Sequence, residues 1–289
     1  MSKITIIASL IRPHQWVKNG FVAAPLLFTP SAMQPENVWA VIWGVLCFCA
    51  VSSAIYCLND IIDTERDRQH PIKKNRPVAA ALINSREAAL IGIILGVAGF
   101  ISAYALSQSF AAIIGAYAAL NVAYCLWLKN YSIIDIMVIA AGFVLRIYAG
   151  SALIGQAPSI WIIQASALLA LFLALAKRRD DLANNLDSEH RPSIKGYNLT
   201  FIDNAMIIVL GALLFCYVVY TTDQTVIAKL GTDQLFMTTP FVIVGILRYL
   251  QITFVEKRSG SPTLVLLTDW KLLGTVACWT AVTIGLIYF

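Results

Sequence analysis

The stretch NDIIDTERD, residues 59–67, gathers oxygen-bearing side chains of the kind that bind a metal ion. Asp60, Asp63 and Asp67 are three and four residues apart, which places them on one face of a helix, and Asn59 directly precedes them. Like charges at this spacing repel each other unless a cation offsets them. Carboxylate oxygens suit Mg²⁺, which leaves its other coordination positions to phosphate and water. We therefore expect these four residues to bind Mg²⁺, or Mn²⁺ in its place, and the three aspartates to be catalytic.

Basic residues follow the acids at once, in HPIKKNRPVAA, residues 70–80. Acids that hold a metal, followed by bases, form the layout expected around a metal–diphosphate complex, in which the metal bridges phosphate oxygens and the bases neutralise the remaining charge. Lys73 and Arg76 are therefore candidate phosphate ligands. The alternative is that these bases set the membrane topology or attract anionic lipid.

A second acidic segment, KRRDDLANNLD, covers residues 177–187. Either Asp180 or Asp181 could supply a further metal ligand, and Asp181 is the one we select as a catalytic and metal-binding candidate. Its neighbours Lys177 and Arg178 are candidate phosphate ligands. The alternative is a charged loop at the membrane interface without a chemical role.

The elements that position these residues are membrane-spanning helices. The chain is 59% hydrophobic and 13% charged, against about 25% charged in soluble domains, and its mean hydropathy is +0.74. We expect one all-α integral membrane domain over residues 1–289, with nine transmembrane helices around a central cavity that opens to the cytoplasm. The expected spans are residues 16–34, 37–58, 87–106, 110–128, 132–153, 159–177, 203–221, 235–254 and 270–288.

The distribution of Lys and Arg orients these spans, because basic residues favour the cytoplasmic side. Of the 21 Lys and Arg, 19 fall on one predicted face of the membrane, and the exceptions are Arg146 and Lys229. This predicts a multi-pass protein of a prokaryotic inner (plasma) membrane, with its N-terminus in the cytoplasm and its C-terminus outside. Topology accounts for the net charge of +5, so we expect no nucleic-acid partner.

Four further polar residues near or within the spans are candidates for the site. Arg146 lies inside a span, where a cation is costly and should face the bundle interior. Its expected partner is a substrate phosphate or an active-site carboxylate, the alternative being a structural acid from another helix. Lys18 is either an interfacial anchor or a phosphate ligand. Tyr124 and Lys129, at the cytoplasmic end of the fourth span, complete the candidate substrate-binding residues.

The first acidic motif resembles NDxxDxxxD of the UbiA-type intramembrane prenyltransferase superfamily, and the resemblance extends over essentially the whole chain. Within that superfamily the sequence is most similar to the branch of decaprenyl-phosphate phosphoribosyltransferases. The usual second motif of the superfamily is DxxxD. This sequence departs from it, because Asp180 and Asp181 are each followed four places on by an asparagine. The segments that carry the similarity are RPHQWVKNGFVAAPLLF (12–28), NDIIDTERDRQHPIKKNRPVAA (59–80), DIMVIAAGFVLRIYAG (135–150), KRRDDL (177–182), PFVIVGILRYL (240–250) and SPTLVLLTDWKLL (261–273).

The resemblance implies a Mg²⁺-dependent transfer between a water-soluble donor and a lipid. The donor would be phosphoribosyl diphosphate, and the acceptor a polyprenyl phosphate in the bilayer whose phosphate oxygen attacks ribose C1. A phosphate monoester is mostly dianionic at pH 7, since its second pKa is about 6, so no strong general base is needed. Two alternatives stay open: transfer of an isoprenoid from its diphosphate to an aromatic quinone or haem precursor, and a membrane transporter.

Overall fold

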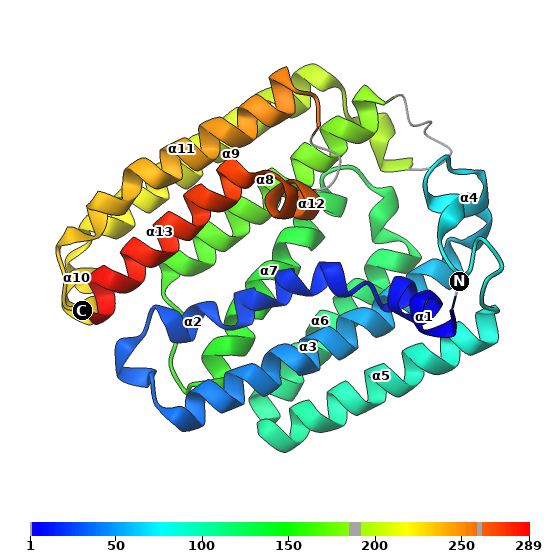
Figure 1. Cartoon of the computed structure of the whole chain (residues 1–289), viewed down its shortest axis with the longest axis horizontal. Coiled ribbons are helices and arrows are strands. Elements are labelled where there is room, and N and C mark those ends of the chain that lie inside the picture. The colour runs from blue at the N-terminus through cyan, green and yellow to red at the C-terminus, as the bar shows by residue number, and fades with distance from the viewer. Residues whose placement is uncertain (1, 185–191, 259–261) are drawn as a thin grey trace.

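The computed structural model describes residues 2–184, 192–258 and 262–289, which are almost entirely helical and contain no strand (Figure 1). Eight helical segments within these ranges are long and apolar enough to cross a membrane. Seven of these correspond to the long helices α3 (Pro35–Ile62), α5 (Ser85–Leu106), α6 (Gln108–Leu126), α7 (Ile134–Leu153), α8 (Ile160–Ala183), α9 (Leu199–Thr222) and α13 (Trp270–Tyr288), and the eighth contains α11 (Thr239–Leu250). The shorter helices are α1 (Lys3–Ile11), α2 (Ala24–Leu27), α4 (Thr64–Gln69), α10 (Gln224–Leu230) and α12 (Pro262–Thr268).

The first expected span, residues 16–34, is not a continuous α-helix, so the prediction of nine transmembrane helices is not confirmed. A 3-10 helix over Pro13–Val22, the single turn of α2 and a 3-10 turn over Pro30–Ala32 take its place. Prolines lack the backbone N–H that a continuous α-helix needs, and two of them, Pro25 and Pro30, divide this stretch. The segment nevertheless runs between α3 and α7 from one end of the bundle toward the other (Figure 1).

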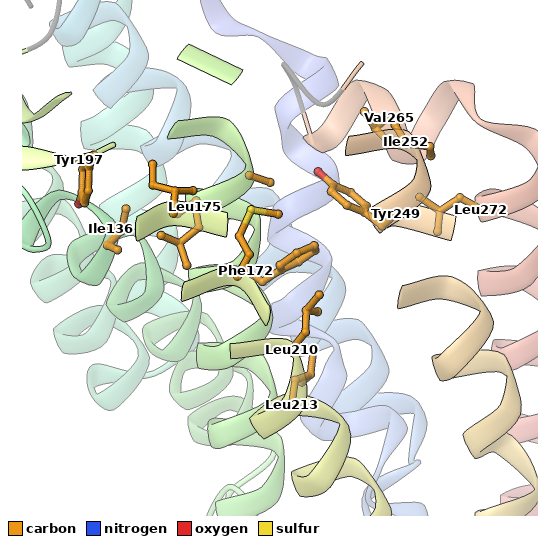
Figure 2. Packing of buried hydrophobic residues seen from close by; sticks show 14 residues of the cluster. Ile136, Phe172, Leu175, Tyr197, Leu210, Leu213, Tyr249, Ile252, Val265 and Leu272 are labelled. Carbon is orange, nitrogen blue, oxygen red and sulfur yellow. The ribbon is translucent and has the colours of Figure 1, made fainter. Parts of the chain in front are cut away.

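The long helices form two groups that meet at α7 and α8 (Figure 1). Residues of α3, α5, α6 and α7 share one buried apolar cluster, with Phe48, Phe110 and Ile114 among its fully buried members. A second cluster joins α8 and α9 to the C-terminal helices (Figure 2). Its members include Phe172, Leu175, Leu210, Leu213, Tyr249, Ile252, Val265 and Leu272.

The connections α3–α5 and α6–α7, with residues 192–198 before α9, lie at the end of the bundle that carries the N-terminus, while the C-terminus lies at the opposite end beside α10 (Figure 1). These connections contain the 3-10 turns Lys73–Asn75, Leu128–Asn130 and Pro192–Gly196. Both charged motifs therefore reach the same end of the molecule.

The broken N-terminal segment packs on α7 at a glycine. A Cβ added to Gly150 would lie 1.9 Å from the Val22 carbonyl oxygen, which is a backbone atom and cannot rotate away. Gly150→Ala should therefore destabilise the protein by about 1–3 kcal/mol, seen as a lower melting temperature in detergent. Gly211→Ala in α9 is the control, because a Cβ there meets nothing within 4 Å. Equal melting temperatures for the two variants would contradict the close contact.

Candidate active site

A polar cavity of about 210 Å³ lies where the charged connections meet. Many of the residues expected from the sequence to bind metal or substrate line it: Asn59, Asp63, Asp67, Lys73, Arg76, Tyr124, Lys129, Lys177 and Arg178. Other lining residues were not anticipated: Arg12, Arg66, His70, Asn121 and Asn130 are the polar ones. The cavity therefore brings together the α3–α4 region, the end of α6 and the end of α8.

The three acids of the first motif do not lie on one continuous helix, contrary to the prediction. α3 ends at Ile62, Asp63 lies at the junction, and Asp67 belongs to α4. The Thr64 hydroxyl bonds to the carbonyl oxygens of Asp60 and Ile61, and such side-chain bonds compete with the helical ladder. The carboxylates nevertheless converge, because Arg76 Nη1 lies 2.6 Å from Asp67 Oδ2 and 3.3 Å from Asp60 Oδ1.

Each carboxylate of the motif is paired with a cation. Asp63 pairs with Lys129 at 2.6 Å, while Asp60, which is 1% exposed, pairs with both Arg76 and Arg12. A buried charge without a partner costs several kcal/mol, so these pairs stabilise the charged groups inside the protein. The cations come from three different parts of the chain, which fixes the geometry of the cavity wall.

Arg12 is a site residue that sequence reasoning missed. It ends α1 with a positive φ of 54°, and its guanidinium lies over the Tyr56 ring, 5.0 Å from the centroid. Its pairing with Asp60 joins residues 48 positions apart, which no local pattern reveals. His70 was also missed; it is buried, and its Nδ1 accepts the backbone N–H groups of Ile72 and Lys73.

The acids fit Mg²⁺ in chemistry but not as a complete protein cage. Over the described ranges, no three His, Cys, Asp or Glu side chains are grouped in a way that could hold a metal ion. Mg²⁺ is usually bound by one or two carboxylates and by substrate phosphates, so a full cage is not required. Asp63 and Asp67 face the cavity, and the buried Asp60 Oδ2 has no hydrogen-bond partner. These oxygens therefore suit a cation that arrives with a phosphate ligand.

The second charged segment continues α8 as far as Ala183, where a loop was expected from residue 177. Arg178 is 1% exposed in its side chain and bonds to Asp135 Oδ2 at 2.7 Å and to Asp181 Oδ2 at 3.0 Å. Asp181 therefore interacts with a cation and is not among the residues that line the cavity. Asp187 lies outside the described residues.

Arg146 is buried, and its partners among the described residues are neutral, so neither an active-site carboxylate nor a structural acid pairs with it there, while the expected substrate phosphate stays a prediction. Its guanidinium donates to Asn19 Oδ1 (3.0 Å), to the Tyr117 hydroxyl (2.9 Å) and to the Gly142 carbonyl (2.9 Å). Aromatic rings of Phe48, Tyr117 and Phe143 face it within 6 Å, a distance at which their π-electrons stabilise a cation. Lys18, which directly precedes Asn19, is half-buried. Neither Lys18 nor Arg146 lines the cavity.

Asp135 and Arg146 do not pair with each other, as expected from their separation along α7. Asp135 instead takes Arg178, and it also accepts hydrogen bonds from the hydroxyls of Ser193 (3.1 Å) and Tyr197 (2.7 Å). Burial, together with the bond to Asp135, raises the pKa of Tyr197 above its ordinary value, so the phenol is protonated and donates at neutral pH. The buried Asp135 was not predicted as a site residue.

Comparison with known proteins identifies the family. Residues 21–272 match the model of the UbiA prenyltransferase family. Decaprenyl-phosphate phosphoribosyltransferase from Mycobacterium tuberculosis is 30% identical over 96% of this chain and 93% of its own length. The protein of the same name from Corynebacterium glutamicum is 32% identical over 96% of this chain and 85% of its length.

Solved structures agree with the fold. A UbiA homolog from Archaeoglobus fulgidus, bound to DMAPP and Mg²⁺, superposes with a TM-score of 0.71 at 20% identity, covering 97% of this chain and 98% of the homolog. Because the family model matches residues 21–272 and the two relatives are at least 30% identical, the chain belongs to the UbiA prenyltransferase family.

The two buried arginines should respond differently to loss of charge. Arg178→Met leaves Asp135, which is 0% exposed, without its guanidinium, and breaking such a buried pair costs about 3–5 kcal/mol. Arg146→Met leaves only neutral acceptors unpaired, which costs about 1–3 kcal/mol. Detergent melting curves should therefore show the larger loss for Arg178→Met. The assignment of partners is wrong if Arg146→Met is as destabilising as Arg178→Met.

Proposed function

We propose that this member of the UbiA prenyltransferase family transfers the 5-phosphoribosyl group from phosphoribosyl diphosphate to a membrane polyprenyl phosphate of the decaprenyl type. The reaction releases diphosphate and requires Mg²⁺, or Mn²⁺ in its place. The charged end of the bundle then faces the cytoplasm of a prokaryotic cell, where the donor is dissolved, and the acceptor stays in the plasma membrane. The names of the curated relatives, and the share of this chain over which they match, support this proposal.

The charge of the cavity is the observation that carries the proposal. Two carboxylates line it, Asp63 and Asp67, against seven cations: Arg12, Arg66, Lys73, Arg76, Lys129, Lys177 and Arg178. Phosphoribosyl diphosphate carries phosphate groups at both ends of a polar sugar, and it needs cations at more than one place. A prenyl diphosphate carries its charge at one end and an apolar chain at the other. The excess of cations therefore favours phosphoribosyl diphosphate, the donor that carries phosphate groups at both ends.

The residues of the α3–α4 wall would hold the leaving group. Asp63 and Asp67, with Asn59 and the free oxygen of Asp60, would bind Mg²⁺ through carboxylate and amide oxygens. The ion, when bound, neutralises diphosphate oxygens as negative charge develops on them. Lys73 and Arg76 lie in the same wall and would stabilise the same charge, which is a contribution made mainly in the transition state.

The end of α8 offers cations for the second phosphate of the donor, Lys177 and Arg178, and the α6–α7 connection adds Lys129. The acceptor phosphate is already mostly dianionic at neutral pH, so its oxygen can attack ribose C1 without a general base. The new C1–O bond forms as the C1–diphosphate bond breaks, and the diphosphate leaves with the electron pair. The chain positions the reactants and shields C1 from water. A role of Arg146 and Lys18 toward the acceptor phosphate stays a prediction.

Prenyl transfer to an aromatic acceptor is the competing function, and it is favoured by the structural neighbour bound to DMAPP and Mg²⁺. Purified protein with Mg²⁺ separates the two. One reaction contains labelled phosphoribosyl diphosphate and polyprenyl phosphate, and the other labelled prenyl diphosphate and 4-hydroxybenzoate. We expect a labelled lipid in the first reaction alone. Product in the second alone would establish prenyl transfer, and product in neither, with transport of the donor into vesicles, would favour a transporter.

The metal assignment predicts the effect of neutralising the acids that face the cavity. Asp63→Asn and Asp67→Asn should each lower turnover about 100-fold or more, since each removes a ligand and frees a cation, while the protein stays folded. Chelation of divalent ions should abolish turnover, and Mg²⁺ or Mn²⁺ should restore it. Glu65→Gln is the matched control, because Glu65 lies between the two acids but is exposed and pairs with Arg68 at the surface. Near-normal turnover of both aspartate variants would remove the metal from these residues.

A further inference from the structure

Asp135 is a buried carboxylate at the start of α7 that the proposed reaction does not use. It is 0% exposed and accepts three hydrogen bonds from side chains that are distant in sequence. Arg178 Nε and Ser193 Oγ donate to Oδ2, at 2.7 and 3.1 Å, and the Tyr197 hydroxyl donates to Oδ1 at 2.7 Å. A buried acid satisfied in this way fixes the orientation of each of its donors.

Two connecting segments are fastened together around this acid. The segment of residues 128–133 precedes α7, and the segment of residues 192–197 precedes α9. Ser132 Oγ donates to the Ser193 carbonyl (2.7 Å), and Ile133 N donates to the Tyr197 hydroxyl (2.5 Å). The segments approach so closely that a Cβ on Gly196 would lie 2.1 Å from Ser132 Oγ.

The backbone at Ile133 indicates that these contacts hold the segment in place. Its φ is +68°, which is unfavourable for a β-branched residue and persists only where surrounding contacts require it. The contacts at hand are the bonds of Ile133 and Ser132 to the other segment and the turn closed by Asp135 N on the Tyr131 carbonyl at 3.0 Å.

Both fastened segments and Arg178 contribute to the cavity wall. Lys129 and Asn130 line the cavity from the first segment, and Pro192 lines it from the second. Lys129 also pairs with Asp63, one of the candidate metal ligands. A displacement of the network around Asp135 would therefore move cations on two sides of the cavity.

We propose that Asp135 is a positioning residue: it holds the Arg178 guanidinium in the cavity wall and, through Tyr197 and Ser193, sets the place of Lys129. It acts on a phosphate-bearing ligand only through these cations. This inference rests on the proposed function in so far as it takes the cavity to bind the diphosphate of a donor.

The chain offers a matched control one residue along α8. Arg179 Nε bonds to Asp203 Oδ1 at 2.7 Å, the same length as the bond between Arg178 and Asp135, but neither residue lines the cavity. Asp203→Asn therefore removes a charge from an ion pair of the same length, with side chains 13% and 33% exposed against 1% and 0% in the pair of Arg178 and Asp135, without touching the cavity wall.

The test measures binding of inorganic diphosphate with Mg²⁺ by calorimetry on the purified full-length protein. Asp135→Asn should weaken binding about tenfold or more, as loss of an orienting partner does at metal sites, and Asp203→Asn should leave it within about twofold. In an Arg178→Met background, where the guanidinium is already absent, Asp135→Asn should have a much smaller further effect. Equal affinities of Asp135→Asn and Asp203→Asn would overturn the proposal.

A second readout does not depend on the donor. Acylation of Lys129 by an amine-reactive ester, followed by mass spectrometry, should be about fivefold faster in Asp135→Asn than in wild type, since the segment that holds Lys129 is released. Asp203→Asn should not change it. If wild-type protein binds no diphosphate, the proposed donor is wrong, and the labelling alone decides: an unchanged rate overturns the positioning role.

Tyr197→Phe keeps the test decisive if Asp135→Asn does not fold. It removes one donor to Asp135 and the acceptor of Ile133 N while leaving every charge in place. The proposal is supported if Tyr197→Phe shows faster labelling of Lys129 and weaker binding of diphosphate, while Asp203→Asn binds diphosphate with unchanged affinity. Wild-type values of both measurements in Tyr197→Phe overturn it.

Discussion

The architecture of this protein depends on one electrostatic constraint: charges enclosed by apolar helices must find charged or polar partners within the protein. At the end of the bundle that carries the N-terminus, the acids Asp60, Asp63 and Asp67 each contact a cation from another part of the chain. Those pairs join α1, α3, α4 and the α6–α7 connection into one wall. The ion pairs hold these segments in fixed positions and so define the shape of the cavity.

The irregular N-terminal segment follows from the same constraint. It places Arg12 against Asp60 at one end and Asn19 against Arg146 further into the bundle. The close contact of Gly150 with the Val22 carbonyl then fixes the segment on α7. A straight α-helix over this stretch would need the N–H groups that its prolines lack.

The sequence was sufficient for those features that depend on local pattern. Hydropathy located the long helices, most accurately the last one, expected at residues 270–288 and observed at Trp270–Tyr288. The acids and bases of the first motif were expected together, and the cavity contains most of them. Hydropathy could not distinguish a broken apolar segment from a helix, because both have the same composition. The helix break at Asp63 depends on a side-chain bond of Thr64, and the roles of Arg12 and Asp135 depend on partners 48 and 43 residues away.

The α3–α4 region contributes carboxylates to the cavity and α8 contributes only cations, and this difference gives a reason for the altered second motif. On α8, Asp181 bonds to Arg178, while Lys177 and Arg178 line the cavity. The acid there offsets the charge of a cation within the protein, and the cavity face of α8 is basic. The α3–α4 side supplies the carboxylates that face the cavity. A ligand with one metal-bound diphosphate and one further phosphate is complementary to a cavity in which only the α3–α4 region supplies carboxylates and α8 supplies further cations, whereas carboxylates from both regions would suit a single diphosphate bound between metal ions. The loss of acids from the second motif is therefore consistent with a donor charged at both ends.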